Sequence, residues 1–365
     1  MVDKLQIMWY YCICREAWEN MIENIKSTIR NIILFVVLIA ITFFIIFKNY
    51  DIKQTIDMIG NANGLYVILA IISMSLYFLF ESINNKCILN NLNRKISIFK
   101  ALKFSIIGFF FSGITPASGG GQPMEVYYMS KDGIPSSYGT LSLLVQMIAF
   151  HTVTVLFAII GAIINYKFMS KVVIILLIYG LITKLAILGI MVLCIISKRA
   201  SKKVIDLIIK LLKIFHVKNI EEKEKSLRTI QEDYNNGAKF IRKNRTVYIR
   251  TLLIIVLQVI CYYAVPYFIY RSFGLSEYNW FTIITLQAVL YCSVASVPLP
   301  GAVGVSEGTF LNIYSLIFGE SLLASSMIIN RAVSFYIFIV IGSIIVSTTT
   351  IKNINKKSNK LKNKY

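Results

Sequence analysis

Long apolar stretches separated by short polar ones run along almost the whole chain. Six of these stretches come close to the roughly 17–25 residues that a membrane-crossing helix needs, and they are Ile32–Phe47, Gly64–Ile83, Ser136–Ile164, Val172–Ile196, Tyr248–Tyr270 and Met327–Thr348. The pattern therefore predicts an all-α polytopic membrane protein with six full spans.

Two further apolar stretches are interrupted by proline and glycine. The first interruption, Thr115–Glu125, reads TPASGGGQPME, and the second, Val297–Glu307, reads VPLPGAVGVSE. Proline removes a backbone donor and glycine permits conformations that other residues avoid, so neither segment continues a helix. At membrane depth such backbone survives only where it is buried in protein or lines a wet cavity.

The two interruptions share one internal spacing. Laid over one another they match at three places, namely Pro116 with Pro298, Gly119 with Gly301, and Glu125 with Glu307. Paired breaks in corresponding halves of a hydrophobic chain are the sequence pointer to a transporter binding site. We therefore expect two re-entrant helical hairpins, over 104–134 and 280–320, with the breaks at their tips.

The composition agrees with a location in the plasma membrane. Of the 365 residues 56% are hydrophobic, and 38 basic residues against 18 acidic ones give a net charge of +20. The basic excess lies in polar segments between the apolar stretches, above all in 84–103, in 198–245 and in the C-terminal tail. This distribution favours the cytoplasmic face of a membrane and anionic inner-leaflet lipids as partners, and no nucleic acid is expected.

The charges also predict the topology. With both termini and both basic segments cytoplasmic, the hairpin 104–134 enters and leaves from the inside, and the hairpin 280–320 from the outside. The halves 31–164 and 172–350 then form an inverted repeat about an axis in the membrane plane. In the alternative topology each hairpin arm crosses fully, and a basic region lies outside.

The remaining segments are expected to lie at the membrane surface. Residues 1–30 predict a cytoplasmic amphipathic lead, and 351–365 a basic cytoplasmic tail. Within the cytoplasmic insert 198–245, apolar residues alternate with lysines between Lys202 and Phe215. This alternation predicts a basic amphipathic helix on the inner leaflet.

The sequence offers little for metal, redox or nucleotide chemistry. The six cysteines include no C-x-x-C pair, most lie in or beside apolar stretches, and the two histidines are His151 and His216. No nucleotide-binding loop is present, so we expect no catalytic residue, no metal and no cofactor. The mixed charges before Ile32 predict no cleavable signal peptide.

At the two breaks the sequence resembles the lysylphosphatidylglycerol synthase transmembrane family, the membrane domain of the multiple peptide resistance factor. The resemblance rests on T-P-A-S-G-G-G-Q-P-x-E at Thr115–Glu125 and on P-x-P-G-x-x-G-V-x-E-G at Pro298–Gly308, and it covers roughly residues 30 to 350. Two positions depart from the family pattern. Ser306 stands where the family usually has an arginine, and Gly301-Ala302 stands where it often has two glycines.

The resemblance implies a lipid flippase. In full-length members of the family this domain moves lipid, while a separate soluble domain makes the aminoacylated lipid from charged tRNA. The residues after Lys352 are not expected to form that soluble domain. The implied substrate is phosphatidylglycerol or an aminoacylated derivative such as lysyl-phosphatidylglycerol, a lipid of antimicrobial-peptide resistance. The chain is then no enzyme by itself. Alternatively, it is the membrane component of a phosphatidylglycerol lysyltransferase that acts with a separate synthase protein, and self-association stays open.

Ten residues are expected to bind the substrate, namely Thr115, Gly119, Gly120, Gly121, Gln122, Glu125, Gly301, Gly304, Glu307 and Arg331. The two glutamates either offset a cationic headgroup in a midplane cavity or stabilise a helix N-terminus. The glycines either let backbone amides approach a phosphate or allow close helix packing. Thr115 and Gln122 bind substrate oxygens or satisfy the broken backbone. Arg331, the candidate substitute for the missing arginine, either grips a lipid phosphate or snorkels to the headgroups.

Three other polar residues lie inside predicted spans. Lys184 falls in the middle of Val172–Ile196, and we expect it to face the helix bundle or to pair with a carboxylate. Gln146 and His151, within Ser136–Ile164, are expected to form interhelical hydrogen bonds.

Overall fold

A computed structural model gives the structure of the chain. It describes residues 50–115, 118–214 and 220–362, together with Val37, Ala40, Ile41, Phe44 and Lys48. The predicted lead 1–30, most of the first span, Pro116 and Ala117 of the first break, and the end of the tail lie outside the described residues. Throughout the described ranges the regular structure is helical, without a strand.

The helices follow one another with short connections. Up to residue 168 they are α2 (Ile52–Gly60), α3 (Gly64–Asn91), α4 (Ile98–Ile114), α5 (Gly121–Lys131), α6 (Ser136–Ile164) and the short helix η2 (Tyr166–Phe168). The next are α7 (Lys171–Ile196), α8 (Lys198–Ile214), α9 (Ile220–Lys243), α10 (Arg245–Tyr263), α11 (Val265–Ser272) and α12 (Trp280–Val294). The last are η3 (Pro300–Ala302), α13 (Val305–Arg331), the π-helix η4 (Ala332–Tyr336) and α14 (Ile337–Lys362).

Polar side chains cap several of the apolar helices. Asn63 accepts a hydrogen bond from the amide two residues later at the start of α3, and Asn279 does so from the amide three residues later at the start of α12. The hydroxyl groups of Ser97 and Ser170 accept in the same way from amides in the first turns of α4 and α7. Because the first turn of a helix leaves its amides free, these caps determine where each apolar helix begins.

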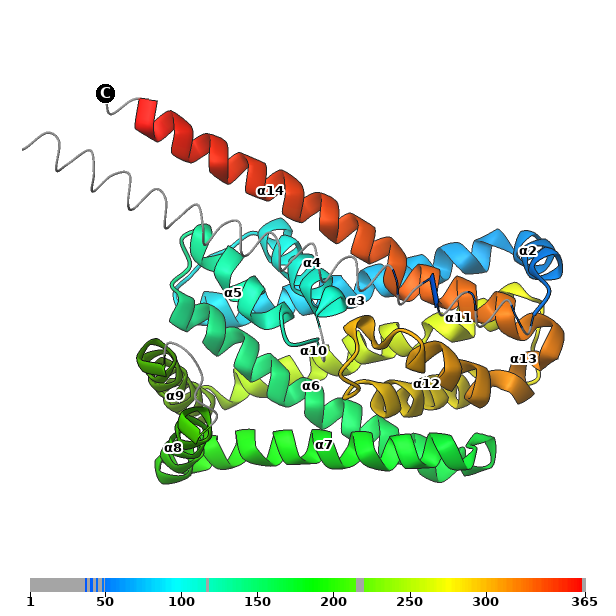
Figure 1. Ribbon diagram of the computed structural model, residues 1–365, viewed down its shortest axis with the longest axis horizontal. Coiled ribbons are helices and arrows are strands. Elements are labelled where there is room, and N and C mark those ends of the chain that lie inside the picture. The colour runs from blue at the N-terminus through cyan, green and yellow to red at the C-terminus, as the bar shows by residue number, and fades with distance from the viewer. Residues whose placement is uncertain are drawn as a thin grey trace, which may run out of the picture.

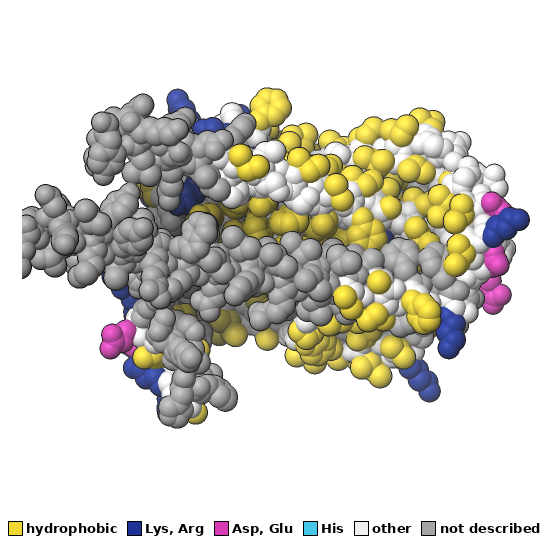
Figure 2. Space-filling model, turned by 45° about the horizontal axis from the view of Figure 1, so that its top comes forward, with side chains coloured by type: hydrophobic (Ala, Val, Ile, Leu, Met, Phe, Trp, Pro, Cys, Tyr) yellow, Lys and Arg dark blue, Asp and Glu magenta, His cyan; other side chains and the backbone are white. Residues whose placement is uncertain are grey.

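The outer surface of the bundle is apolar. Five segments of the described chain are long and apolar enough to cross a membrane, namely Gly64–Asn91, Ser136–Ile164, Lys171–Leu193, Arg245–Ser272 and Pro300–Ile351. Figure 2 shows a broad band of hydrophobic side chains, with charged side chains gathered at the two ends of the molecule. An exposed apolar band flanked by charge suits lipid rather than water. The chain is a membrane protein, as the sequence predicts.

Two helix–break–helix units lie at opposite ends of the bundle. We call α4, residues 115–120 and α5 the first break unit, and α12, residues 295–304 and α13 up to Phe318 the second break unit. In Figure 1 the first unit lies at the end that holds α8 and α9, and the second lies toward the end that holds α2. Each unit runs from its own end to the middle of the bundle and back.

A glycine ends the second break unit. Gly319 has φ 68° and ψ 166° and divides α13 into two helical parts. Such a positive φ favours glycine, and beyond it the chain continues as one long helix through η4 into α14. The sequence interpretation began this last helix at Met327, so the observed start lies earlier. Arg331 therefore lies twelve residues beyond the turn (331 − 319) rather than within one turn of the helix start.

The two break units meet at their broken ends. A Cβ atom on Gly301 would lie 3.3 Å from the carbonyl oxygen of Gly113 and 2.5 Å from the ring of Phe335. The residues around this contact form one buried apolar cluster, made of Phe110, Ile114, Val303, Phe335 and Ile339. The broken end of the second unit thus lies against the backbone of the first, and a side chain at Gly301 would collide mainly with Phe335 of η4.

Helix α3 packs against the first break unit and shares an apolar cluster with the second. Its middle contributes Phe78 to the largest apolar cluster, which also contains Leu286 of α12 and Phe310 of α13. Its C-terminal part contributes Leu89 to a second cluster with Tyr128 of α5 and other residues of the first break unit. The sequence predicted a span ending near Ile83, but α3 continues to Asn91 and so reaches the first unit.

Candidate functional site

The first break is closed by its own side chains. Thr115 Oγ1 accepts a hydrogen bond from the Gly120 amide at 2.9 Å and donates one to the Phe111 carbonyl oxygen at 2.6 Å. Thr115 therefore satisfies the backbone on both sides of the break. Gly119 and Gln122, by contrast, are exposed.

Glycines let α4 and α5 pack in backbone contact. A Cβ atom on Gly121 would lie 1.9 Å from Ser112 Oγ and 2.7 Å from the carbonyl oxygen of Gly108. A Cβ atom on Gly108 would in turn lie 2.7 Å from Oε2 of Glu125. Because a side chain at Gly121 would overlap the backbone of α4 and one at Gly108 would displace Glu125, the close crossing of the two helices depends on these glycines.

Glu125 lies in a buried polar network. Only 3% of its surface is exposed, and it points from α5 toward α3, where Asn85 Nδ2 donates to its Oε1 at 2.9 Å. Asn85 Oδ1 accepts from the Ser142 hydroxyl at 3.1 Å and from Gln146 Nε2 at 2.8 Å. Glu81, one turn earlier on α3, lies within electrostatic range of Glu125. The network thus joins α3, α5 and α6, and Gln146 forms the interhelical bond that the sequence predicts.

Glycines in the left-handed region shape the second break. Gly301 and Gly304 have φ values of 59° and 87°, which residues with a side chain rarely adopt. Glu307 Oε2 accepts a hydrogen bond from the Gly304 amide at 2.7 Å, which satisfies a free donor at the start of α13. Glu307 therefore satisfies a backbone amide at the second break, as Thr115 does at the first. Glu125, its counterpart in sequence spacing, turns instead to α3.

Glu307 also forms a buried ion pair with Arg331. The Nε atom of Arg331 lies 2.7 Å from Oε1 of Glu307, and both side chains are buried. Nη2 of Arg331 donates to the Gly301 carbonyl oxygen at 3.1 Å, and the guanidinium carbon lies 4.4 Å from the ring centroid of Phe335. Arg331 thus ties the long last helix to the second break. Its burial excludes the snorkelling position, because a snorkelling side chain reaches water or headgroups.

The two carboxylates belong to separate networks rather than to one shared cavity. Between these networks lie Tyr77 of α3 and Tyr262 of α10, whose ring centroids are 5.6 Å apart. Tyr77 is within electrostatic range of Glu81, and Tyr262 is within electrostatic range of Arg331. A row of polar groups therefore connects the Glu125 network with the Glu307–Arg331 pair.

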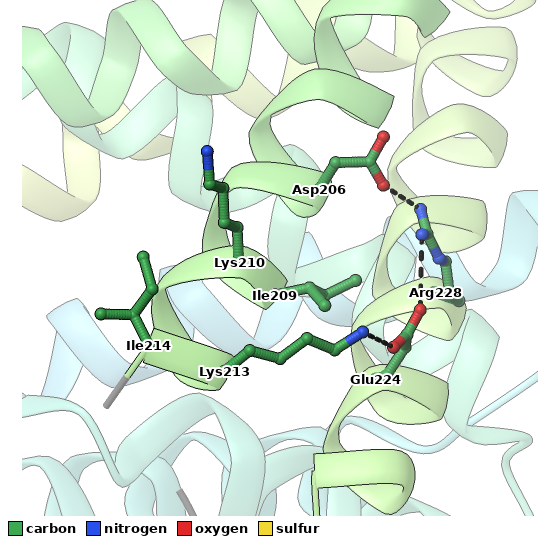
Figure 3. Close-up of a pocket in the computed structure, with 7 residues that line it drawn as sticks. All are labelled: Asp206, Ile209, Lys210, Lys213, Ile214, Glu224 and Arg228. Atoms are coloured by element: carbon green, nitrogen blue, oxygen red, sulfur yellow. Dashed lines mark ion pairs between the residues drawn. The ribbon is translucent and has the colours of Figure 1, made fainter. Parts of the chain in front are cut away.

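A surface hollow between α8 and α9 lies apart from both breaks (Figure 3). Arg228 of α9 lies 2.7 Å from Asp206 and 3.5 Å from Glu224, and Lys213 lies 3.2 Å from Glu224. Both acids of the hollow are thus paired, and Lys210 adds one further positive charge to its lining. We therefore interpret it as the contact between two amphipathic helices and not as the substrate site.

The residues that contain both break units match a known family. Residues 31–342 match the family described as the lysylphosphatidylglycerol synthase TM region. The chain belongs to this family. The resemblance of the two break motifs is therefore confirmed, and both break units and Arg331 lie within the matched residues.

Three similar proteins are described as UPF0104 membrane proteins. The one from Archaeoglobus fulgidus is 25% identical over 316 residues, which cover 85% of this chain and 94% of the relative. The one from Methanothermobacter thermautotrophicus is 22% identical over 301 residues, covering 78% and 86%. The one from Pyrococcus horikoshii is 25% identical over 310 residues, covering 81% and 90%. These descriptions state a membrane location and name no activity.

In this member of the family described as the lysylphosphatidylglycerol synthase TM region, Ser306 stands where an arginine is expected. Ser306 is buried beside Glu307. The guanidinium on Glu307 comes instead from Arg331, on the helix beyond the Gly319 turn. A positive charge is thus present at the second break, although it comes from another place in the sequence.

Sequence reasoning did not identify Asn85 or Tyr262. Asn85 follows Glu81 by four residues in an apolar helix, so the two side chains share a face, and this spacing is a signal for a buried polar site. Tyr262 gave no signal, because tyrosines are common near membrane interfaces for reasons unrelated to a site.

Proposed function

We propose that the chain is a lipid translocase that moves the headgroup of a phospholipid between the two leaflets of the plasma membrane. One observation carries the proposal: two broken helical units meet at their broken ends, and each has a buried carboxylate close to its break. Broken helices near the bilayer midplane are where several transporter folds bind substrate. Ionisable groups buried at membrane depth are costly and usually belong to a substrate pathway.

The topology that fits this function has six full spans and two re-entrant hairpins. α12 has 15 residues and α5 has 11. At 1.5 Å per residue they measure about 22 Å and about 16 Å, which is short of the roughly 30 Å of a hydrocarbon core. With the basic segments inside, the first hairpin enters from the cytoplasm and the second from outside, and both termini are cytoplasmic. The halves 31–164 and 172–350 are then an inverted repeat.

The headgroup binds when the two break units separate. In the contact described above, the apolar cluster around Phe335 seals the broken ends, and Glu307 and Arg331 satisfy each other. A lipid phosphate takes the guanidinium of Arg331 from Glu307 by bidentate hydrogen bonds. The ammonium of an aminoacylated headgroup pairs with the released Glu307 or with Glu125. Gly119 and Gln122, exposed at the first break, make the first contact, and the acyl chains stay in lipid.

The substrate class is an anionic or aminoacylated phospholipid, such as phosphatidylglycerol or lysyl-phosphatidylglycerol. The family description names the second of these lipids. One arginine and two carboxylates near the breaks offer partners for both a phosphate and an ammonium. Lysyl-phosphatidylglycerol would use the whole set, and phosphatidylglycerol, which has no ammonium, would use only the arginine.

A leaflet-resolved assay in proteoliposomes tests the function. Fluorescent phosphatidylglycerol or lysyl-phosphatidylglycerol is placed in both leaflets, and the outer pool is quenched chemically, so that the slow fraction reports movement from the inner leaflet. The protein should accelerate that movement over empty vesicles, and Glu277→Gln, in an exposed connection, should behave as wild type. No acceleration with either lipid would overturn the proposal.

The family description also favours a second candidate, the membrane component of a lipid lysyltransferase. In the described chain the largest part outside the bundle is the pair α8–α9, which is too small for a domain that binds tRNA and transfers an acyl group. A separate synthase protein would have to supply it. Formation of lysyl-phosphatidylglycerol by cells that express this chain alone would support an enzyme and contradict the need for such a partner.

A further inference from the structure

A buried lysine lies in the middle of α7, outside both break units. Lys184 is 3% exposed, whereas Ile182 and Leu185 beside it expose 62% and 48% of their surface to the lipid side. Its ammonium lies 4.8 Å from the ring centroid of Tyr291 on α12. The sequence predicted that Lys184 either faces the helix bundle or pairs with a carboxylate, and in the structure it faces the bundle. Among the described residues no carboxylate pairs with it.

One unsatisfied polar atom lies near this lysine, and a second lies near its tyrosine partner. His151 of α6 lies within electrostatic range of Lys184, and its Nδ1 atom is buried without a hydrogen-bond partner among the described residues. The hydroxyl of Tyr263 on α10 is likewise buried and unpartnered there, and its ring lies 5.9 Å from that of Tyr291. Cys292 also lies within electrostatic range of the lysine. Three helices therefore meet around the ammonium in one cluster, with one spare hydrogen-bonding atom on His151 and no described carboxylate, and Tyr263 of α10 adjoins them through Tyr291.

The cluster adjoins the second break. The hydroxyl of Thr183, the residue before Lys184, donates to Ser296 Oγ at 2.6 Å, and Ser296 belongs to the break segment 295–304. A Cβ atom on Gly180 would lie 1.9 Å from the carbonyl oxygen of Cys292, so α7 and α12 cross in backbone contact one turn before Lys184. An occupant of the cluster would therefore lie beside the broken end of the second unit, just behind the lipid-facing side of α7.

The charge balance of the cluster points to an anionic occupant. An ammonium at membrane depth without a counter-charge is expensive, and a contact with one tyrosine ring offsets only part of that expense. We propose that Lys184 is the cation of a phosphate-binding site, with the Tyr263 hydroxyl and His151 Nδ1 as hydrogen-bond donors. The choice of a lipid phosphodiester over free phosphate rests on the translocase function proposed above, and the experiment separates these two sources.

Stabilisation by ligand tests the site without requiring transport. Purified protein in detergent is heated with dioctanoyl-phosphatidylglycerol, with dioctanoylglycerol, which lacks the phosphate, or with inorganic phosphate, and the melting temperature is recorded. Lys184→Met removes the charge and keeps the length, Lys184→Arg keeps the charge, and Lys171→Met is a matched control at an exposed lysine of the same helix. Saturating phosphatidylglycerol should raise the melting temperature of wild type, Lys184→Arg and Lys171→Met by roughly 5 °C. It should raise the melting temperature of Lys184→Met clearly less, because only Arg331 at the second break then remains as a partner for the phosphate.

The outcomes distinguish the sources and the alternatives. A shift with inorganic phosphate that requires Lys184 supports the site and assigns free phosphate as its ligand. Equal shifts in wild type and Lys184→Met, or no shift with either phosphate probe, overturn the proposal. Without ligand, Lys184→Met should melt at or above wild type because it removes an unpaired buried charge. A drop of several degrees would assign the lysine to structure and also overturn the proposal.

The result is independent of the translocation assay. A protein that binds phosphate through Lys184 but moves no lipid would overturn the function proposed above and leave this site standing. A protein that moves lipid but shows no change in melting temperature that depends on Lys184 would overturn this site and leave the translocase function standing.

Discussion

Replacing Glu307 with glutamine removes one charge from the ion pair that holds the second break. Glutamine keeps the side-chain length and a carbonyl oxygen, so the bond from the Gly304 amide can persist. The guanidinium of Arg331, however, is left buried without its counter-ion. We therefore expect Glu307→Gln to lower stability through electrostatics rather than through lost packing.

The expected size follows from distance and burial. Nε of Arg331 lies 2.7 Å from Oε1 of Glu307, and the two side chains are only 10% and 3% exposed. Two unit charges about 4 Å apart attract by about 4 kcal/mol at an effective dielectric constant of about 20. Removing one partner of a buried pair typically costs about 3–5 kcal/mol. The pair of Lys103 and Asp132 is a matched control, because its side chains are 25% and 23% exposed and such a pair is worth about 1 kcal/mol or less.

Unfolding in mixed micelles of rising SDS content, followed by helical circular dichroism, measures the effect. Glu307→Gln should lower the free energy of unfolding by about 3 kcal/mol or more, and Asp132→Asn by about 1 kcal/mol or less. Adding Arg331→Met to Glu307→Gln should recover part of the loss, because it removes the unpaired charge. The reasoning is refuted if Glu307→Gln costs no more than Asp132→Asn, or if the double variant is less stable than Glu307→Gln alone.

Three further predictions test the first break and the topology. Glu125→Gln should keep its hydrogen bond from Asn85 of α3 and change the free energy of unfolding by about 1 kcal/mol or less. It should nevertheless abolish lipid movement in proteoliposomes. A fully active variant would argue against a role for the charge of Glu125. Gly121→Ala should lower the free energy of unfolding in the SDS assay by about 1–3 kcal/mol, because its methyl group would overlap α4. Gly64→Ala, which has open space around its Cβ, should leave that free energy unchanged. Equal effects of the two variants would contradict the close crossing of α4 and α5. In a cysteine-free background, Glu277→Cys should react with an impermeant maleimide on intact cells. Asp132→Cys should react only after the cells are permeabilised. The opposite result would invert the proposed topology.

Much of the helical layout follows from the hydrophobic pattern alone. The predicted span Ser136–Ile164 coincides with α6, and Val172–Ile196 differs from α7 by one residue. The proline and glycine segments end α4 and α12 near the predicted places, because their backbone cannot continue the hydrogen-bond ladder. The distribution of polar and apolar residues was sufficient to predict these helix ends, since lipid-facing helices are apolar along their length and polar at their ends.

The partners of the site residues did not follow from the sequence. Glu125 meets Asn85 across 40 residues, and Glu307 meets Arg331 across a turn at Gly319. Tertiary packing decides such pairs, and periodicity carries no information about it. Gly319 was missed because a single glycine within an apolar helical pattern is tolerated and marks no boundary. The shared spacing of the breaks predicted equivalent roles for the two glutamates, yet Glu307 caps its own helix while Glu125 reaches a neighbouring one.

The π-helix that follows Arg331 sets the angular position of α14. A π-turn closes its hydrogen bonds one residue later than an α-turn, so Ala332–Tyr336 accommodates an additional residue. Each residue advances an α-helix by about 100°, and without the wider turn the additional residue would rotate everything beyond it by about that angle. Phe338 would then leave Phe78, and Ile339 would leave Gly113. Removing one residue from this turn should therefore leave the contacts of α14 in place, whereas inserting one residue into the regular helix beyond it should break them.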